Sequence, residues 1–232
     1  MTEPLQQADH FLKAQSLECE RDGRTLFRDL SFSIVPGTLT RVEGPNGSGK
    51  TTLLRILSGL NDNWSGHIDW CGQPRHKQWD SVRRNILYLG HRPGIKGVLT
   101  PMENLQALVA GRQAISPDVL SQALVQVGLG PWQGVPCEHL SAGQKRRVVL
   151  ARLLFADEPL WLLDEAFTAL DVEAVAAVER LLVDRVGDGG AVVITTHHQP
   201  ALKNMQRILL GHGPDQPPAE TSDEPLREAL HG

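Results

Sequence analysis

The stretch that decides the fold reads Gly44-Pro45-Asn46-Gly47-Ser48-Gly49-Lys50-Thr51. It matches the pattern G-x-x-x-x-G-K-[ST] at every fixed position and follows an extended segment over 39–43. Glycines let backbone N–H groups wrap around a phosphate, Lys50 reaches the β- and γ-phosphates, and the Thr51 hydroxyl binds Mg²⁺. A helix expected over 51–60 adds a partial positive charge that faces the anion. The stretch therefore predicts a site for a nucleotide and Mg²⁺, with Thr52 as a further contact.

The composition is that of a globular protein. A chain of 232 residues with 41% hydrophobic content can bury a sizeable core as one domain with a subdomain. The formal net charge of −4 gives no bulk attraction to nucleic acid or to anionic lipid. The three cysteines, Cys19, Cys71 and Cys137, are far apart and are interpreted as ordinary thiols. No apolar run approaches the roughly 18 residues of a membrane span, so a membrane role requires a partner protein.

Short strand patterns alternate with helical ones along the chain. The expected strands are 30–35, 39–43, 67–71, 86–89, 160–163, 191–195 and 208–210, and the expected helices are 51–60, 102–111, 117–127, 141–155 and 173–186. The continuous apolar runs 160–163 and 191–195 are typical of strands buried on both faces of a parallel sheet. The alternation predicts an α/β sheet flanked by helices, with a mostly helical insertion over about 92–155.

A pair of carboxylates follows one of these apolar runs, in Leu160-Trp161-Leu162-Leu163-Asp164-Glu165. A strand that ends in a carboxylate places Asp164 beside the phosphate loop, where it can hold Mg²⁺ through water. Glu165, one residue further on, can polarise the attacking water. The acidic pair Asp157-Glu158 is the alternative, but it follows a helical stretch instead of a buried strand. The sequence therefore assigns the acidic site to Asp164 and Glu165.

Further motifs give the chain a family resemblance. Leu140-Ser141-Ala142-Gly143-Gln144 opens a helix about twenty residues before the acidic strand, Ala169-Leu170-Asp171 follows that strand, and His197 lies just beyond another. Together with the phosphate loop, these motifs make the chain resemble an ABC-type ATPase over nearly its whole length. The resemblance implies a P-loop NTPase fold of ABC type over 1–212, with a mostly parallel sheet core, an antiparallel β subdomain and a helical subdomain over about 92–155. The acidic, proline-rich tail 213–232 is expected to be disordered.

The resemblance also implies roles for these motifs. Ser141 caps its helix, and the helix end formed by Ser141, Gly143 and Gln144 addresses the γ-phosphate held by a second copy. Two chains would then pack head to tail as a homodimer with two ATP molecules between them. Asp171 matches an aspartate that communicates between the two sites. His197 matches a histidine that senses the γ-phosphate, and the adjacent His198 is the alternative for that role.

Some positions depart from the general ABC pattern. His91 stands where most members have a glutamine after the strand, and it is assigned a catalytic, phosphate-sensing role here. An imidazole titrates near neutral pH and is a poorer ligand for Mg²⁺ than an amide oxygen. Arg21 stands about where an aromatic ring would stack on adenine, and a guanidinium plane can stack as well. These departures leave the rate of hydrolysis and the choice of nucleotide open, while ATP binding is expected.

The same departures sharpen the resemblance. The segments 19–22, 90–96, 140–147 and 163–171 look like those of the ATP-binding subunits of the bacterial haem exporter of cytochrome c maturation, the CcmA-like family. That resemblance implies a peripheral protein on the cytoplasmic face of the inner membrane, docked on integral membrane subunits of a cytochrome c maturation complex. Haem is not expected to bind this chain directly.

The sequence has three alternative interpretations. The first is the ATPase subunit of another ABC exporter. The second, an ABC ATPase that acts on nucleic acid or ribosomes, normally needs two fused halves or a long coiled coil, together with basic surfaces. This chain has one half and an acidic balance, so no nucleic-acid partner is expected. The third is a regulatory module with little turnover, which Glu165 argues against and His91 keeps open.

Overall fold

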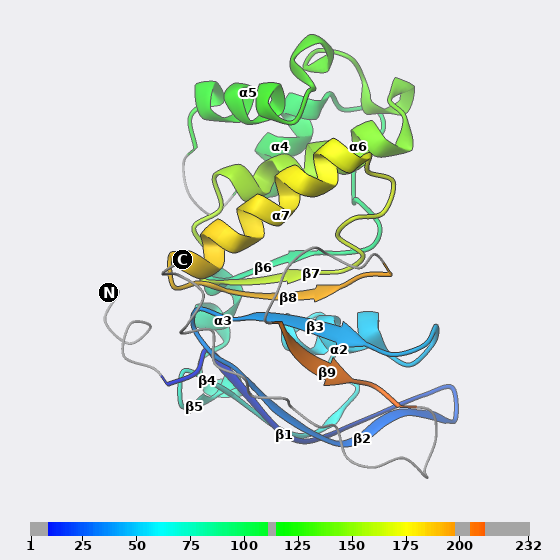
Figure 1. Ribbon diagram of the computed structural model, residues 1–232, viewed down its shortest axis with the longest axis vertical. Helices are drawn as coiled ribbons and strands as arrows, with labels where there is room; N and C mark the ends of the chain where they lie inside the picture. The colour runs from blue at the N-terminus through cyan, green and yellow to red at the C-terminus, as the bar shows by residue number, and fades with distance from the viewer. Residues whose placement is uncertain (1–8, 111–114, 198–204, 212–232) are drawn as a thin grey trace, which may run out of the picture. The chain divides into compact units, whose positions relative to one another are not determined.

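The computed structural model describes residues 9–110, 115–197 and 205–211. Within this part the chain forms two compact units (Figure 1). Of the described residues, the first unit holds 9–88, 158–166, 182–197 and 205–211, and the second holds 89–110, 115–157 and 167–181. The predicted acidic tail over 213–232 and the alternative histidine His198 lie outside the described residues.

A five-stranded sheet carries the core of the first unit. Its strand order is β6-β7-β8-β3-β9. The bounds are β3 (Leu39–Glu43), β6 (Ile86–Leu89), β7 (Leu160–Leu163), β8 (Ala191–Thr195) and β9 (Gln206–Leu209). The pairs β7–β8, β8–β3 and β3–β9 are parallel. Every residue of β7 and β8 is buried, as the apolar runs predicted for strands covered on both faces.

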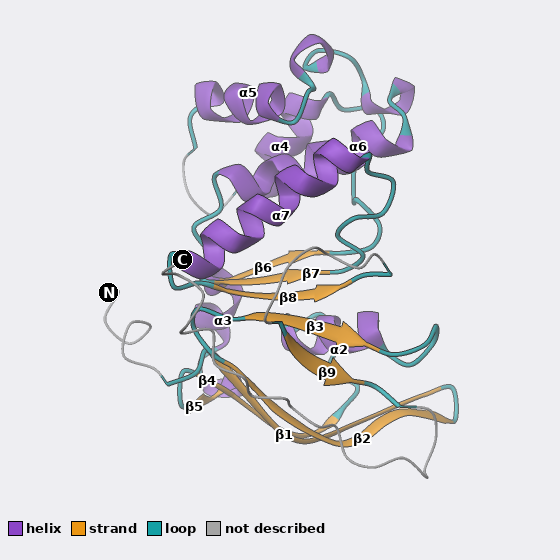
Figure 2. Ribbon diagram, in the orientation of Figure 1, coloured by secondary structure: helices purple, strands orange, loops and turns teal. Residues whose placement is uncertain are grey.

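A second sheet in the same unit is antiparallel, with the order β2-β1-β4-β5 (Figure 2). Its strands are β1 (Leu12–Arg21), β2 (Arg24–Ile34), β4 (Ser65–Trp70) and β5 (Gln73–Pro74). The pairing of β1 with β2 shifts register at several points, and Ser16 and Asp29 take left-handed φ values of 46° and 51°. Such bulges interrupt the alternation of buried and exposed side chains. For this reason the sequence pattern predicted only the last part of β2 and missed β1.

The helices of the first unit are short. They are α2 (Lys50–Leu57), α3 (Trp79–Asn85) and the 3₁₀ turn η1 (Arg75–Lys77). Helix α2 begins directly after the phosphate loop and buries Leu53, Leu54, Ile56 and Leu57. It ends three residues before the predicted end at Leu60, because Gly59 takes a left-handed φ of 74° that terminates the helix.

The second unit contains most of the remaining helices. They are α4 (Pro101–Val109), α5 (Pro117–Gln126), α6 (Ala142–Leu150) and the first part of α7 (Val172–Gly187), with the 3₁₀ turns η2 (Gly130–Trp132), η3 (Cys137–His139) and η4 (Ala151–Leu154). The side chains of Leu105, Leu120, Leu124 and Val148 form part of its apolar core. The helix predicted over 141–155 is α-helical only to Leu150 and continues as η4.

None of the helices in the described ranges has the length and apolar content that crossing a bilayer requires.

A buried arginine fixes the end of α2 in the first unit. The Arg75 side chain lies between two indoles, with its guanidinium carbon 4.9 Å from the ring centre of Trp64 and 5.5 Å from that of Trp79. Its Nη1 donates to the carbonyl oxygen of Ile56, in the last turn of α2. Burial lowers the pKa of Arg75, and the nearby charge of Asp62 opposes that shift. Arg75 therefore adds a charged donor to a helix-end carbonyl oxygen that also accepts from the Gly59 N–H at 3.0 Å.

We predict that Arg75→Ala lowers the free energy of unfolding by about 2–4 kcal/mol, because it removes a charged hydrogen bond and two cation–π contacts. Urea denaturation measures this change. The matched control is Arg84→Ala on the exposed side of α3, which is expected to change the stability by less than about 0.5 kcal/mol. Equal losses of stability in the two variants would show that the contacts of Arg75 with Trp64 and Trp79 contribute nothing specific.

Candidate functional site

The phosphate loop connects β3 to α2 and needs glycine at several positions. Gly44, Gly47 and Gly49 have φ values of 149°, 81° and 100°, in the region that L side chains rarely adopt. A Cβ atom on Gly44 would lie 2.6 Å from the Leu210 carbonyl oxygen and 2.6 Å from Ser48 Oγ. The backbone can therefore turn tightly into α2. Free N–H groups at the start of this helix point toward any anion that binds the loop.

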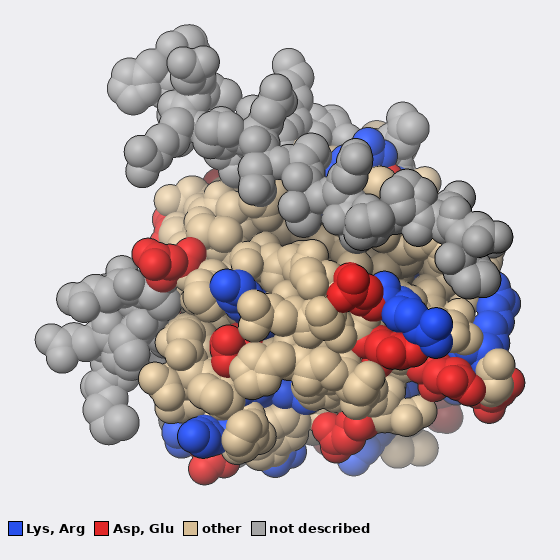
Figure 3. Space-filling view, turned by 90° about the horizontal axis from the view of Figure 1, so that it is seen from below, with Lys and Arg blue, Asp and Glu red and all other residues tan. Residues whose placement is uncertain are grey.

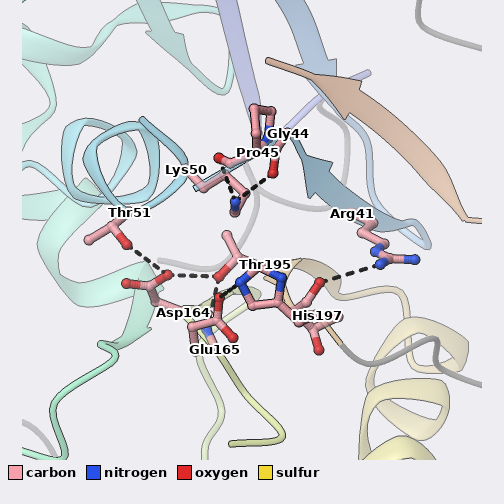
Figure 4. Close-up of polar contacts among 10 residues, drawn as sticks. Arg41, Gly44, Pro45, Lys50, Thr51, Asp164, Glu165, Thr195 and His197 are labelled. Atoms are coloured by element: carbon pink, nitrogen blue, oxygen red, sulfur yellow. Dashed lines mark hydrogen bonds and ion pairs between the residues drawn. The ribbon is translucent and has the colours of Figure 1, made fainter. Parts of the chain in front are cut away.

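The Lys50 side chain folds back over this loop (Figure 4). Its Nζ donates to the Gly44 carbonyl oxygen at 2.6 Å and to the Pro45 carbonyl oxygen at 3.1 Å. These contacts keep a full positive charge beside the backbone N–H groups of the loop. The arrangement suits a polyphosphate, which carries several negative charges on neighbouring groups.

Asp164 lies at the carboxyl end of β7 with only 1% of its surface exposed. Its Oδ1 accepts a hydrogen bond from Thr51 Oγ1 at 3.2 Å and another from Thr195 Oγ1 at 2.7 Å. A hydroxyl and a carboxylate at this spacing are oxygen ligands of the type that Mg²⁺ prefers, with water and substrate phosphates completing its shell. The residues present therefore fit the predicted metal.

Glu165 has an unusual backbone conformation. Its φ is +53°, a left-handed value that costs a non-glycine residue roughly 1–2 kcal/mol. Its N–H donates to Thr195 Oγ1 at 2.8 Å, and its Oε1 lies 3.4 Å from His197 Nε2. The structure thus brings Glu165 and His197 together, as the assignment of both to one site requires.

A residue of β3 contacts the backbone just before His197. Arg41 Nη2 donates to the carbonyl oxygen of Thr196 at 3.3 Å (Figure 4). Arg41 Nε lies 3.5 Å from Glu43 Oε1, and Glu43 also accepts from Arg207. This chain of charged groups orients the backbone from which the His197 side chain extends.

The alternative acidic pair lies at the opposite end of β7. Asp157 and Glu158 precede the strand, whereas Asp164 and Glu165 follow it. The Glu158 carbonyl oxygen accepts from Arg185 Nη2 at 2.7 Å. Because the phosphate loop follows the carboxyl end of the parallel strand β3, only the second pair lies at the edge of the sheet that carries this loop.

The second unit holds the other predicted group. Ser141 Oγ accepts from the Gln144 N–H at 3.2 Å, and Gln144 Oε1 accepts from the Ser141 N–H at 2.9 Å, which forms a complete capping box for α6. A Cβ atom on Gly143 would lie 2.8 Å from the Ala169 carbonyl oxygen, so this close approach requires glycine. The start of α6 is therefore capped, and its first turn presents backbone N–H groups that have no intrahelical acceptor.

Asp171 lies in the same unit and caps the start of α7. Its Oδ1 accepts from the Ala174 N–H at 2.9 Å, and its Oδ2 accepts from Arg147 Nη2. Arg147 extends from α6, so this ion pair connects the Ser141–Gln144 helix to the Asp171 turn. The sequence motifs did not identify Arg147, although its position one turn after Gln144 places it near the same helix end.

Two further predicted residues are exposed in the described structure. His91 is exposed in a bend after β6, in the second unit. Arg21 is exposed at the turn between β1 and β2, and its Nε lies 3.3 Å from Asp22 Oδ2. The roles assigned to His91 and Arg21, like those of the other site residues, remain predictions.

The sequence is similar to those of known proteins. The family model described as ABC transporter matches residues 27–168. The cytochrome c biogenesis ATP-binding export protein CcmA of Hahella chejuensis is 47% identical over 201 residues, which cover 86% of this chain and 95% of that protein. The protein of the same name from Salmonella typhi is 47% identical over 205 residues, which cover 87% of this chain and 98% of that protein.

Solved structures show the same fold. A bacterial ABC transporter cassette with a dimeric structure superposes with a TM-score of 0.75 at 23% identity, covering 86% of this chain and 94% of the other. At this level of identity the likeness establishes the fold alone. The predicted fold class, a P-loop NTPase of ABC type with a parallel core, an antiparallel sheet and helices, is confirmed.

The electrostatics of the Asp164 group can be tested through Tyr88, which is the only tyrosine in the chain. Burial, together with the negative charge of Asp164, raises the pKa of Tyr88 from 10.0 to about 12, and Arg55 opposes this shift. We predict that Asp164→Asn lowers this pKa and that Arg55→Gln raises it. Rapid alkaline titration followed by tyrosinate absorbance measures both changes.

Because the folded-state pKa of Tyr88 exceeds the ordinary value, Tyr88 stabilises the fold fully below pH 10, and this contribution is lost as the pH rises from 10 to about 12. Shifts of the same sign in both variants would contradict the opposing effects of the Asp164 and Arg55 charges on the pKa of Tyr88.

Proposed function

We propose that this chain hydrolyses Mg-ATP to drive haem export for cytochrome c maturation, because it belongs to the ABC transporter family and, within it, to the cytochrome c biogenesis ATP-binding export proteins, CcmA. It is an ATP-binding subunit whose ATPase activity is coupled to transport. The observation that carries the mechanism is the contact of Asp164 with Thr51, the residue after Lys50, at the carboxyl edge of the parallel sheet. This contact unites the phosphate-binding and acidic motifs.

Each residue of the first-unit group has a role in this proposal. The loop N–H groups and Lys50 bind the phosphates, Thr51 and Asp164 hold Mg²⁺, and Glu165 accepts a proton from the attacking water. When bound, the metal neutralises negative charge on the β- and γ-phosphates. His197, 3.4 Å from Glu165 Oε1, orients that carboxylate and can donate a hydrogen bond to the γ-phosphate.

The second-unit group completes the site in a dimer. The roles given above to residues of the first unit do not involve the capped N-terminus of α6 or the Asp171 turn. We propose that Ser141, Gly143 and Gln144 of one copy bind the γ-phosphate held by the loop of a second copy, with ATP enclosed between the two. The dimeric cassette among the solved structures supports this arrangement.

We predict that Glu165→Gln lowers the rate of ATP hydrolysis by roughly 100-fold or more while Mg-ATP still binds, because an amide cannot act as a general base. Steady-state hydrolysis and nucleotide binding measure the two quantities. Glu158→Gln, at the other end of β7, is the matched control and should change the rate less than about threefold. If Glu158→Gln is the inactive variant, the acidic site has been assigned to the wrong pair.

We infer a membrane partner from the names of the relatives. The relatives are named export proteins, and we propose that this chain docks as a peripheral subunit on integral membrane proteins of a cytochrome c maturation complex, at the cytoplasmic face of the inner membrane. Haem would then be handled by those subunits. Acidic and basic side chains lie interspersed over the described part of the face in Figure 3, which suits a protein partner better than a nucleic acid.

We predict that the tagged chain, purified from detergent-solubilised membranes of its own organism, brings down integral membrane proteins that handle haem. Mass spectrometry identifies them, and Glu165→Gln with ATP should retain them. Recovery of the integral subunits of a different exporter would transfer the chain to that exporter while leaving its ATPase assignment intact. Recovery of ribosomes or nucleic acid would contradict the membrane assignment.

A further inference from the structure

A single buried hydroxyl connects the two acidic residues of the proposed site. Thr195 ends β8 and has 0% of its surface exposed. Its Oγ1 donates to Asp164 Oδ1 at 2.7 Å and accepts the Glu165 N–H at 2.8 Å (Figure 4). The motifs identified from the sequence do not assign a role to this residue.

The direction of both hydrogen bonds is fixed by chemistry. A backbone N–H can only donate, so the Thr195 oxygen must accept from Glu165. The hydroxyl has one proton, and that proton is then available only to the Asp164 carboxylate. Asp164 Oδ1 also accepts from Thr51, so its two lone pairs are both used. The Thr195 hydroxyl therefore has one orientation, which sets the rotamer of Asp164 and the backbone of Glu165 together.

The surrounding sheet makes Thr195 a rigid support. In the register of β7 with β8 the last pair is Leu163 with Ile194, so Asp164 and Thr195 are the next residues along their strands. On its other side Thr195 still pairs with Val42 of β3. Asp164 and Glu165 have thus left the β7 ladder, whereas Thr195 remains within the sheet. The two hydrogen bonds of the Thr195 hydroxyl take the place of backbone ladder bonds at this position.

The backbone of Glu165 depends on such a support. A left-handed φ of +53° is unfavourable for glutamate and persists only where neighbouring groups hold it. The bond from the Glu165 N–H to Thr195 is one such restraint. Loss of this bond would let the backbone relax toward common φ values and turn the carboxylate away from its position near His197.

We propose that Thr195 is a positioning residue for ATP hydrolysis, which sets the orientation of the Mg²⁺-binding carboxylate and of the general base without touching the nucleotide. This proposal rests on the proposed function of Asp164 and Glu165. It differs from a purely structural role for a buried strand-end threonine, which would affect stability and would leave the rate per folded molecule unchanged.

The decisive variants change the hydroxyl and the methyl group of Thr195 separately. Thr195→Val keeps the shape and removes both hydrogen bonds, and Thr195→Ser keeps the hydroxyl and removes the methyl group. Thr40→Val is the matched control, because Thr40 is buried in β3 of the same sheet and its hydroxyl donates to Gln206 Oε1 at 3.3 Å, away from the acidic residues. All three are compared with the unmodified full chain.

We expect Thr195→Val to lower kcat by roughly 30-fold or more, while the affinity for ATP without Mg²⁺ changes less than about threefold. Thr195→Ser should restore kcat to within about threefold, and Thr40→Val should leave it within about twofold. Rates are corrected for the folded fraction, measured by thermal unfolding. A normal kcat in Thr195→Val, or equal losses in the Val and Ser variants, would overturn the proposal.

A second measurement needs no turnover. In the nucleotide-free protein, NMR hydrogen exchange of the Glu165 amide should become about tenfold faster or more in Thr195→Val and remain slow in Thr195→Ser and Thr40→Val. Unchanged exchange in Thr195→Val would overturn the positioning role even if the rate fell.

The Glu165→Gln variant distinguishes failure of the positioning role of Thr195 from failure of the proposed ATPase function. If it loses turnover while Thr195→Val does not, the positioning role fails and the proposed function stands. If Glu165→Gln retains turnover, the proposed function fails, and the exchange of the Glu165 amide still decides whether Thr195 holds it.

Discussion

The parallel pairing of β7, β8 and β3 is the constraint on which the site depends. Parallel strands end at the same edge of a sheet, so the residues that follow these three strands meet there. The phosphate loop follows β3, Asp164 and Glu165 follow β7, and Thr195 ends β8. Thr51 and Asp164 are 113 positions apart in the sequence. Asp164 nevertheless accepts hydrogen bonds from the hydroxyls of Thr51 at 3.2 Å and Thr195 at 2.7 Å. A shift of one strand by a single residue would break this set of contacts.

Several features of the site could be predicted from the sequence because they depend on local chemistry. The glycines at 44, 47 and 49 are needed for left-handed φ values within the loop itself, and the capping box of Ser141 with Gln144 spans three residues. The apolar runs that became β7 and β8 were equally clear, since strands buried on both faces need continuous apolar residues. Local patterns of this type can be recognised without knowledge of the tertiary structure.

Other features depend on register or on packing and were therefore missed. Strand β1 is interrupted by bulges, so its alternation does not mark it as a strand. Thr195 and Arg147 gain their importance from partners 31 and 24 positions away, which no local motif reveals. A polar residue that ends an apolar strand of a parallel sheet is the signal that would have found Thr195. The φ of Glu165 likewise follows from its tertiary contacts.

In the proposed dimer, each ATP is bound by the phosphate loop of one copy and the α6 end of another. The direct test mixes a Lys50→Ala chain with an Ala142→Asp chain, both also carrying Glu165→Gln so that bound ATP is retained. Ala142 is exposed at the first position of α6, where a carboxylate suits the helix and would repel a phosphate, and Ala142→Asn is the uncharged control.

Only the mixed dimer contains one intact site, formed by the loop of one chain and the helix end of the other. We expect that neither variant alone retains labelled ATP in a dimer, whereas the mixture retains about one ATP per mixed dimer. Retention of ATP by Ala142→Asp alone, or failure of the mixture to retain it, would contradict a site shared between two copies.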